Sequence, residues 1–143
     1  MRASLVRLFL LSLALPLASA TALVAPVLAQ TTPPAVAAFG TALERGDASG
    51  LRPLLAERLL VSIGGDSRVY SREQALHVLG RFLRDRPASA VVFDAPRETG
   101  TDALFAAGRY RSDGETFVVR VLFGTRGGRL EAREVRIDQG RLE

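Results

Sequence analysis

The 143-residue sequence contains no cysteine, lysine, asparagine or tryptophan. Without cysteine the chain has no disulfide, no thiol nucleophile and no attachment point for a lipoprotein anchor. All 19 basic residues are therefore arginines, which do not titrate in the usual pH range. The pI of 10.8 overstates the basicity, because the formal net charge is only +4. Arginine alternates with aspartate and glutamate near the C-terminus, a pattern typical of a solvated surface.

Motifs for catalysis and metal binding are missing as well. His77 is the single histidine, and no spacing of His, Asp and Glu is typical of a metal site. No serine lies in a Gly-x-Ser-x-Gly elbow. The glycine pairs at 64–65 and 127–128 lack the Lys-Ser or Lys-Thr of a phosphate-binding loop. We therefore expect no metal and no cofactor, and the sequence favours a protein that is not an enzyme.

The N-terminus has the pattern of a Sec-type secretory signal peptide. Arg2 and Arg7 precede an apolar run at 8–17, and Ala18-Ser19-Ala20 follows as a small-residue cleavage pattern. A second possible cleavage point follows Ala29. An uncleaved membrane anchor is the alternative, but two prolines and several hydroxyl residues interrupt the apolar run.

We accordingly divide the chain into three parts. Residues 1–29 are the predicted signal peptide and cleavage region, and residues 30–36 are a flexible lead-in. Residues 37–143 are a single domain, long enough to bury one core. The expected location is periplasmic or extracellular, with no membrane contact after cleavage.

Three helices are predicted from periodicity and capping signals. Residues 35–45 carry an apolar stripe at helical spacing, with Gly46 suited to its C-cap. Asp47 suits the N-cap of a short second helix. A third helix over 71–84 begins with a capping box formed by Ser71 and Gln74. Its buried stripe should be Leu76, Leu79 and Leu83, which leaves His77 exposed.

Strands are predicted at 58–63, 68–70 and 89–93, followed by three strands within residues 103–137. Residues 94–101 form a loop or a broken strand pair. Helices that are segregated from an antiparallel sheet define the α+β class. We therefore expect a curved antiparallel sheet wrapped around N-terminal and central helices.

The turn sequences predict the pairing of the last three strands. A loop over 112–115 pairs Tyr110 with Phe117 on the core side. For the next turn two alternatives exist, because a one-residue slip exchanges the two faces of a strand. A two-residue Gly127-Gly128 turn would place Val135 outside, whereas a three-residue loop over 126–128 buries Val135 opposite Val119, together with Ile137. We expect the three-residue loop, since it keeps charged residues out of the core.

Five segments carry a resemblance to a known family: FGTALERGDASGLRPLLA, LVSIGG, VYSREQALHVLGRFL, AAGRY and VLFGTRGGRLEAREVRI. In this order, over residues 39–137, they resemble the cone-shaped α+β fold of the nuclear transport factor two-like superfamily. The resemblance is closest to the exported bacterial domain of unknown function family 4783. It implies a curved sheet over helices and often a dimer. It implies no activity, although some members of the superfamily are isomerases or dehydratases.

Candidate ligand contacts at the mouth of such a cone are Tyr70, Tyr110, Phe117 and Glu131. Ala106 and Gly108 would leave room there for a helix or a ligand. An acid–base enzyme would need Asp94, Asp102 or Glu131 buried beside Tyr110 and facing a cavity.

Three functions are consistent with the sequence. The first is an exported, non-catalytic binding module for a small apolar ligand or a partner protein. Val118 and Leu122 leave apolar surface on the outer sheet face, which predicts a homodimer through that face. The second is the acid–base enzyme. The third is a binder of anionic surfaces, for which nucleic acid is not expected, using five arginines: Arg126, Arg129, Arg133, Arg136 and Arg141.

Overall fold

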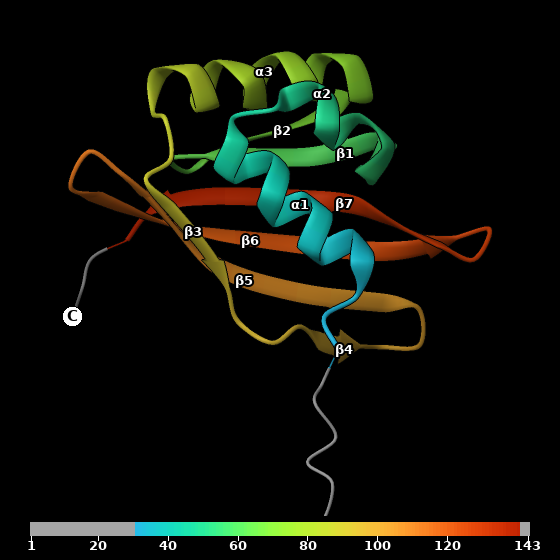
Figure 1. Ribbon diagram of the computed structural model, residues 1–143. Helices are drawn as coiled ribbons and strands as arrows, with labels where there is room; N and C mark the ends of the chain where they lie inside the picture. Colours follow the sequence, from blue (N-terminus) through green and yellow to red (C-terminus); the bar gives the residue numbers. More distant parts are fainter. Residues whose placement is uncertain (1–30, 141–143) are drawn as a thin grey trace, which may run out of the picture.

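The computed structural model describes residues 31–140, which fold into helices on one side of a seven-stranded sheet. The predicted signal peptide and Arg141 lie outside the described residues. Within residues 31–140, no helix is long and apolar enough to cross a membrane. Figure 1 shows the helices crossing one face of a curved, open sheet, with β4 near the point where the chain enters.

The elements follow the predicted order. In sequence they are α1 (Pro34–Arg45), α2 (Ala48–Leu51), a 3₁₀ turn η1 (Arg52–Leu54), β1 (Leu55–Ile63), β2 (Asp66–Ser71), α3 (Arg72–Asp85), β3 (Ala90–Phe93), β4 (Arg97–Thr99), β5 (Ala103–Ser112), β6 (Glu115–Arg126) and β7 (Arg129–Gln139). The fold class is α+β, as predicted. Helix α1 begins at Pro34, so residues 34–36 of the predicted lead-in belong to the folded domain, with Val36 already buried.

The helix ends match the capping signals. At α3, Ser71 Oγ accepts a hydrogen bond from the Gln74 backbone N–H at 3.3 Å, and Gln74 Oε1 accepts from the Ser71 N–H at 3.2 Å. Gly46 closes α1 in the left-handed conformation, with φ of 65°. Asp47 Oδ1 then accepts from the Gly50 N–H at 3.0 Å, and this bond is the largest cause that lowers the pKa of Asp47. These contacts are local, which is why residue type alone predicted them.

The sheet is mixed, which corrects the predicted all-antiparallel arrangement. Its order is β2-β1-β7-β6-β5-β3, with β4 paired to β5 beyond the end of β3. Every pair is antiparallel except β1 and β7, which run parallel from Leu60 opposite Glu134 to Ile63 opposite Ile137. No hairpin joins β1 to β7, and the whole intervening chain serves as their crossover. Turn chemistry therefore gives no signal for their relative direction.

The hairpin of β5 and β6 has the predicted register. Tyr110 lies opposite Phe117, and Gly108 lies opposite Val119. The turn is tighter than expected, since Ser112 and Glu115 also pair across Asp113-Gly114. Asp113 has φ of 47° and Gly114 has φ of 79°, the positive values that a two-residue hairpin turn needs.

The hairpin of β6 and β7 buries Val135 and Ile137 as predicted, but by another device. The predicted three-residue loop is wrong: Arg126 pairs with Arg129 across a two-residue turn. The register shifts further along, where Phe123 lies opposite Ala132 while Leu122 lies opposite Glu134. Arg133 is thus an extra residue in β7.

This β-bulge supplies the one-residue shift that we had assigned to the loop. Val135 consequently pairs with Val121, and not with Val119 as predicted.

Candidate functional site

The inner face of the sheet, where a cone-shaped fold would hold a ligand, is filled by aromatic side chains. The ring of Phe39 from α1 meets the Phe123 ring edge-on, with 5.8 Å between centroids. Phe82 from α3 lies 5.4 Å from both Phe117 and Tyr110. Phe39, Phe123 and Tyr110 have no solvent exposure. Side chains rather than ligand therefore occupy this face.

A slot between two glycines explains how the interior is closed. A Cβ on Gly108 would lie 2.9 Å from Phe93 Cδ1 and 2.7 Å from the Val92 carbonyl oxygen. A Cβ on Gly40 of α1 would lie 3.2 Å from the same ring. Neither glycine has a positive φ, so space and not backbone conformation requires them. The room that Gly108 leaves is occupied by Phe93.

Tyr110 is a core residue whose hydroxyl reaches a backbone partner. Its hydroxyl donates to the Arg86 carbonyl, where the chain leaves α3. The Ser112 hydroxyl donates to the next carbonyl, that of Pro87, at 2.7 Å. Burial raises the pKa of Tyr110. Within residues 31–140, every buried side-chain nitrogen or oxygen has a hydrogen-bond partner, so the interior offers a ligand no unpaired polar side-chain atom.

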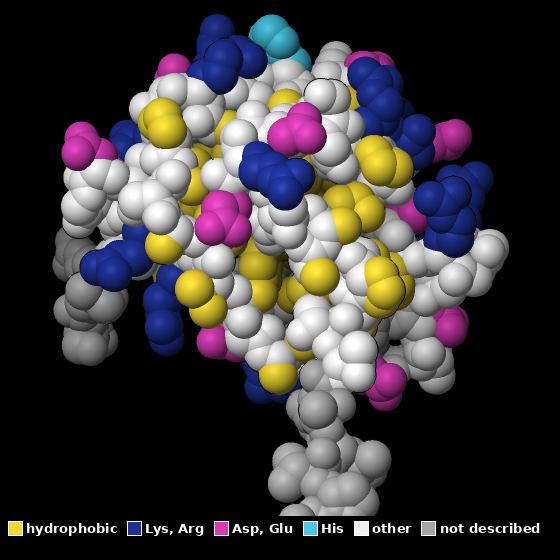
Figure 2. All heavy atoms as spheres, in the orientation of Figure 1, with side chains coloured by type: hydrophobic (Ala, Val, Ile, Leu, Met, Phe, Trp, Pro, Cys, Tyr) yellow, Lys and Arg dark blue, Asp and Glu magenta, His cyan; other side chains and the backbone are white. Residues whose placement is uncertain are grey.

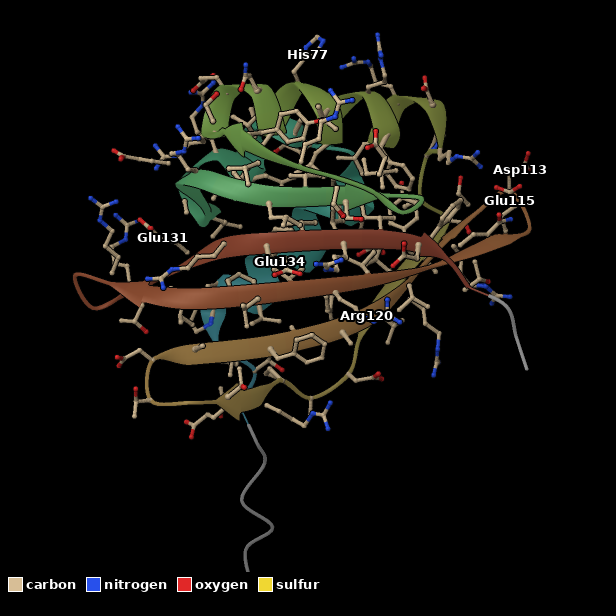
Figure 3. All side chains as sticks on the ribbon, turned by 180° about the vertical axis from the view of Figure 1, so that it is seen from behind. His77, Asp113, Glu115, Arg120, Glu131 and Glu134 are labelled. Carbon is tan, nitrogen blue, oxygen red and sulfur yellow. The ribbon has the colours of Figure 1, made fainter. Side chains whose placement is uncertain are left out.

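The four candidate ligand contacts do not form one site. Tyr110 and Phe117 are neighbours, with rings 6.3 Å apart, and both are buried. Tyr70 is half-buried on β2, the strand at the opposite edge of the sheet from β3. Glu131 is half-buried near the β6–β7 turn (Figure 3).

The carboxylates needed for acid–base catalysis also lie away from Tyr110. Asp94 and Asp102 are exposed. Glu131 pairs with Gly124, which pairs with Ala103. Glu131 therefore lies level with Ala103, at the opposite end of β5 from Tyr110. The seven residues from Ala103 to Tyr110 span about 23 Å at about 3.3 Å per residue.

The single histidine, the metal-ligating residue types and the surface charges do not form a site either. His77 is exposed on α3 and points away from the sheet, as predicted (Figure 3). No cluster of metal-ligating side chains occurs in residues 31–140. The helix side carries basic and acidic side chains intermixed, with no large region of one sign (Figure 2).

The outer face of the sheet is the surface that the described elements leave uncovered (Figure 3). Strand pairing aligns a row across it, and the row joins Val69, Leu60, Glu134, Leu122 and Phe105. Val69 is 59% exposed, and Leu60, Leu122 and Phe105 are half-buried. Glu134 is the single charged side chain between these apolar ones.

Most of this row was missed from the sequence. The predicted β5–β6 register already placed Phe105 opposite Leu122, so Phe105 could have been found. Leu60 and Val69 join the row only through the parallel pairing of β1 with β7, which had no sequence signal.

Ion pairs neutralise the charges in the middle of the outer face. Arg120 Nη1 lies 3.1 Å from Asp138 Oδ2, and Arg136 pairs with Glu134. Between them is a shallow hollow of about 250 Å³, lined by Phe105, Arg120, Leu122, Glu134 and Arg136. The centre of the face is thus apolar, with its charges paired at the surface.

A second, larger hollow lies at the β3 end of the same face. It measures about 390 Å³ and is lined by Ala90, Val92, Arg109, Arg111 and Thr116. Val92 is 62% exposed, although valine usually prefers the interior. None of these five residues was predicted as part of a site.

The five arginines of the anionic-surface hypothesis are dispersed. Arg126 and Arg129 lie at the β6–β7 turn, where Arg126 Nη1 is 3.7 Å from Glu57 Oε2. Arg133 donates to the Thr125 carbonyl at 3.2 Å. Arg136 is paired with Glu134, and Arg141 lies outside the described residues.

Comparisons with solved structures agree with this architecture. A protein of the DUF4783 family from Bacteroides ovatus is 18% identical with a TM-score of 0.70, and the match covers 78% of this chain and 98% of that one. One from Bacteroides uniformis is 15% identical with a TM-score of 0.69, covering 73% and 96%. An NTF2-like protein from Streptomyces avermitilis, whose description suggests a dehydratase, is 15% identical with a TM-score of 0.58, covering 75% and 92%. At such identities the similarity shows the fold alone.

No curated protein matches the chain. The sequence profile of one family matches residues 36–138, which is most of the described domain. The chain therefore belongs to the family described as Domain of unknown function (DUF4783), and its fold is NTF2-like.

Proposed function

We propose that this protein is an exported, non-catalytic binding module whose binding surface is the outer face of the sheet. The observation that carries the proposal is the contrast in occupancy between the two faces. Aromatic side chains fill the inner face, and Phe93 closes it. The outer face keeps an apolar row at the surface with no described element above it.

The partner that this surface fits best is a second copy of the chain. Leu122 and Phe105 are large apolar residues, and their row extends toward Leu60 and Val69. The adjacent ion pairs keep the centre of the face nearly neutral, so two copies can stack without strong repulsion. The row spans five strands, β2, β1, β7, β6 and β5. With strands about 4.8 Å apart and three residue rows about 6.7 Å apart, the patch covers about 480 Å² per copy, the size of a weak interface.

Light scattering coupled to gel filtration tests this proposal. The purified protein should elute with twice its chain mass at about 200 μM, since a face of this size supports micromolar association. Leu122→Asp would bury a charge in the interface and should give a monomer. His77→Asp, at an exposed position on α3, is the matched control and should leave the dimer intact.

Circular dichroism of Leu122→Asp separates dissociation from unfolding, because a folded monomer keeps the native spectrum. A wild-type monomer at the same concentration would contradict the second-copy proposal.

The acid–base alternative has no supporting geometry, because none of its three carboxylates lies buried beside Tyr110. Heparin chromatography tests the anionic-surface alternative. Retention well above physiological salt would support that alternative, whereas early elution follows from a dispersed set of arginines.

A further inference from the structure

The hollow at the β3 end of the outer face combines apolar lining with two arginines that have no acidic partner among residues 31–140. Arg109 and Arg111 are alternate residues of β5, so both project from the same face, with backbones about 6.7 Å apart. Opposite them on β3 lie Val92 and Ala90. Thr116 on β6 borders the hollow on its other side.

Neither arginine side chain makes an ion pair or hydrogen bond within residues 31–140. Two of the carboxylates near them are engaged elsewhere: Asp138 pairs with Arg120, and Glu115 pairs with Arg86. Two guanidinium groups thus lie beside one hollow without an ion-pair partner in the described part of the chain. Guanidinium groups bind carboxylates by paired, charge-assisted hydrogen bonds.

The rest of the hollow favours an apolar group. Val92 is one of two large apolar side chains that are highly exposed in residues 31–140, and Ala90 lies two residues before it. The volume of about 390 Å³ falls in the range of small-molecule sites, about 300–1,000 Å³.

The wall that carries Val92 is held in place from both ends of β3. At one end, the Ser89 N–H donates to the Arg111 carbonyl at 2.7 Å, and the Ser89 hydroxyl donates to it at 3.1 Å. At the other end, the Phe93 ring sits in the glycine slot of the inner face. A preformed wall lowers the ordering cost of binding.

We propose that this hollow binds a small amphipathic acid, in which one carboxylate is attached to an apolar chain or ring. The carboxylate lies between Arg109 and Arg111, and the apolar part covers Val92 and Ala90. The site lies two residue rows away from Leu122, so it goes beyond the proposed dimer and does not depend on it.

Calorimetric titration with octanoate tests this site, and 1-octanol is the matched neutral probe. Octanoate should bind with a sub-millimolar Kd and more weakly as salt rises, because exposed charges are screened. Octanol should bind at least tenfold more weakly. Arg109→Gln and Arg111→Gln should each weaken octanoate binding about tenfold, the size expected for one charge-assisted bond.

Two further variants locate the site. Val92→Ser should weaken octanoate binding several-fold, because it removes apolar contact while keeping the arginines. Arg129→Gln, at the β6–β7 turn, removes the same charge elsewhere and should leave binding unchanged. Equal affinity for octanoate and octanol, or equal loss for Arg129→Gln and Arg109→Gln, would overturn the proposal.

The test of octanoate binding can be separated from the test of the dimer. Leu122→Asp should abolish the dimer and keep octanoate binding, whereas Arg109→Gln should keep the dimer and weaken octanoate binding about tenfold. Loss of octanoate binding in Leu122→Asp would place the ligand in the centre of the face and so contradict this site.

Discussion

The two faces of the sheet are made by alternating residues of the same strands, yet they meet opposite surroundings. On β6, Phe123 points inward against Phe39 and has no exposure, while its neighbour Leu122 points outward and is half-buried. On β5, Gly108 faces the Phe93 ring, while Arg109 faces solvent. The two faces differ in exposure because the helices cover only the inner one (Figures 1 and 3).

This contrast shows where stability and function separate in the molecule. The inner face gains its free energy from close aromatic packing, which leaves no space for a ligand. The outer face keeps apolar side chains at the surface, where they contribute less to folding and remain available for binding. The predictions below test this separation, beginning with the largest expected effect.

Removing an inner ring should cost far more stability than removing an outer one. Phe123→Ala deletes a buried ring and should lower the free energy of unfolding by about 3–5 kcal/mol. Phe105→Ala, on the outer side of the adjacent strand, should lower it by about 1 kcal/mol, since its ring is half-exposed. Urea unfolding of both variants measures the difference. Similar losses would mean that the outer face is buried too.

The glycine slot should resist even one added methyl group. Gly108→Ala places a Cβ against the Val92 carbonyl and the Phe93 ring, and should cost about 1–3 kcal/mol by overpacking. Ala107→Ser, one residue away on the outer face, should stay within about 0.5 kcal/mol. Adding Phe93→Leu to Gly108→Ala relieves only the ring contact, so a thermal melt should show partial rescue. A neutral Gly108→Ala would show that the interior has spare room.

The buried hydroxyl of Tyr110 should make stability depend on alkaline pH. At pH 8, Tyr110→Phe should lose about 1 kcal/mol, the usual net value of one hydrogen bond. Because burial raises the pKa of Tyr110 above 10.0, its stabilising contribution is complete below pH 10.0 and is lost as pH rises through the folded-state pKa. The gap between wild type and variant should therefore shrink between pH 8 and pH 11, measured by urea unfolding. If the stability difference between wild type and Tyr110→Phe stayed constant with pH, the raised pKa of Tyr110 would be contradicted.

Deleting the bulge residue should change stability least, because it leaves both faces of β7 in place. Without Arg133, Glu134 directly follows Ala132, and the ladder continues with Leu122 opposite Glu134 and Val121 opposite Val135. We expect this deletion to remain folded with a near-native melting temperature.

The matched control deletes another arginine of β7. Deletion of Arg136 would turn Ile137 outward and bring the next charged residue into the core, so it should unfold or strongly destabilise the domain. If the two deletions behaved alike, Arg133 would not be the residue that corrects the register.

The sequence predicted what depends on neighbouring residues. The capping box of Ser71 and Gln74, the left-handed Gly46 and the β5–β6 register all arise from contacts within a few positions. Hydrophobic alternation predicted that Val135 is buried, even though the loop chosen to explain it was wrong. Alternation shows which face of β7 must be buried. One extra residue in the loop and one extra residue in a bulge both turn that face inward, so alternation does not distinguish them.

What only the tertiary structure decided depends on elements far apart in the chain. The parallel pairing of β1 with β7 forms the outer row, and no turn joins these strands to set their direction. The filling of the inner face depends on Phe93 reaching both Gly40 and Gly108. The sequence showed a small residue at Gly108, which is consistent with an open pocket as well as with a filled one. Only the packed structure distinguishes them, because a side chain from another strand occupies that space.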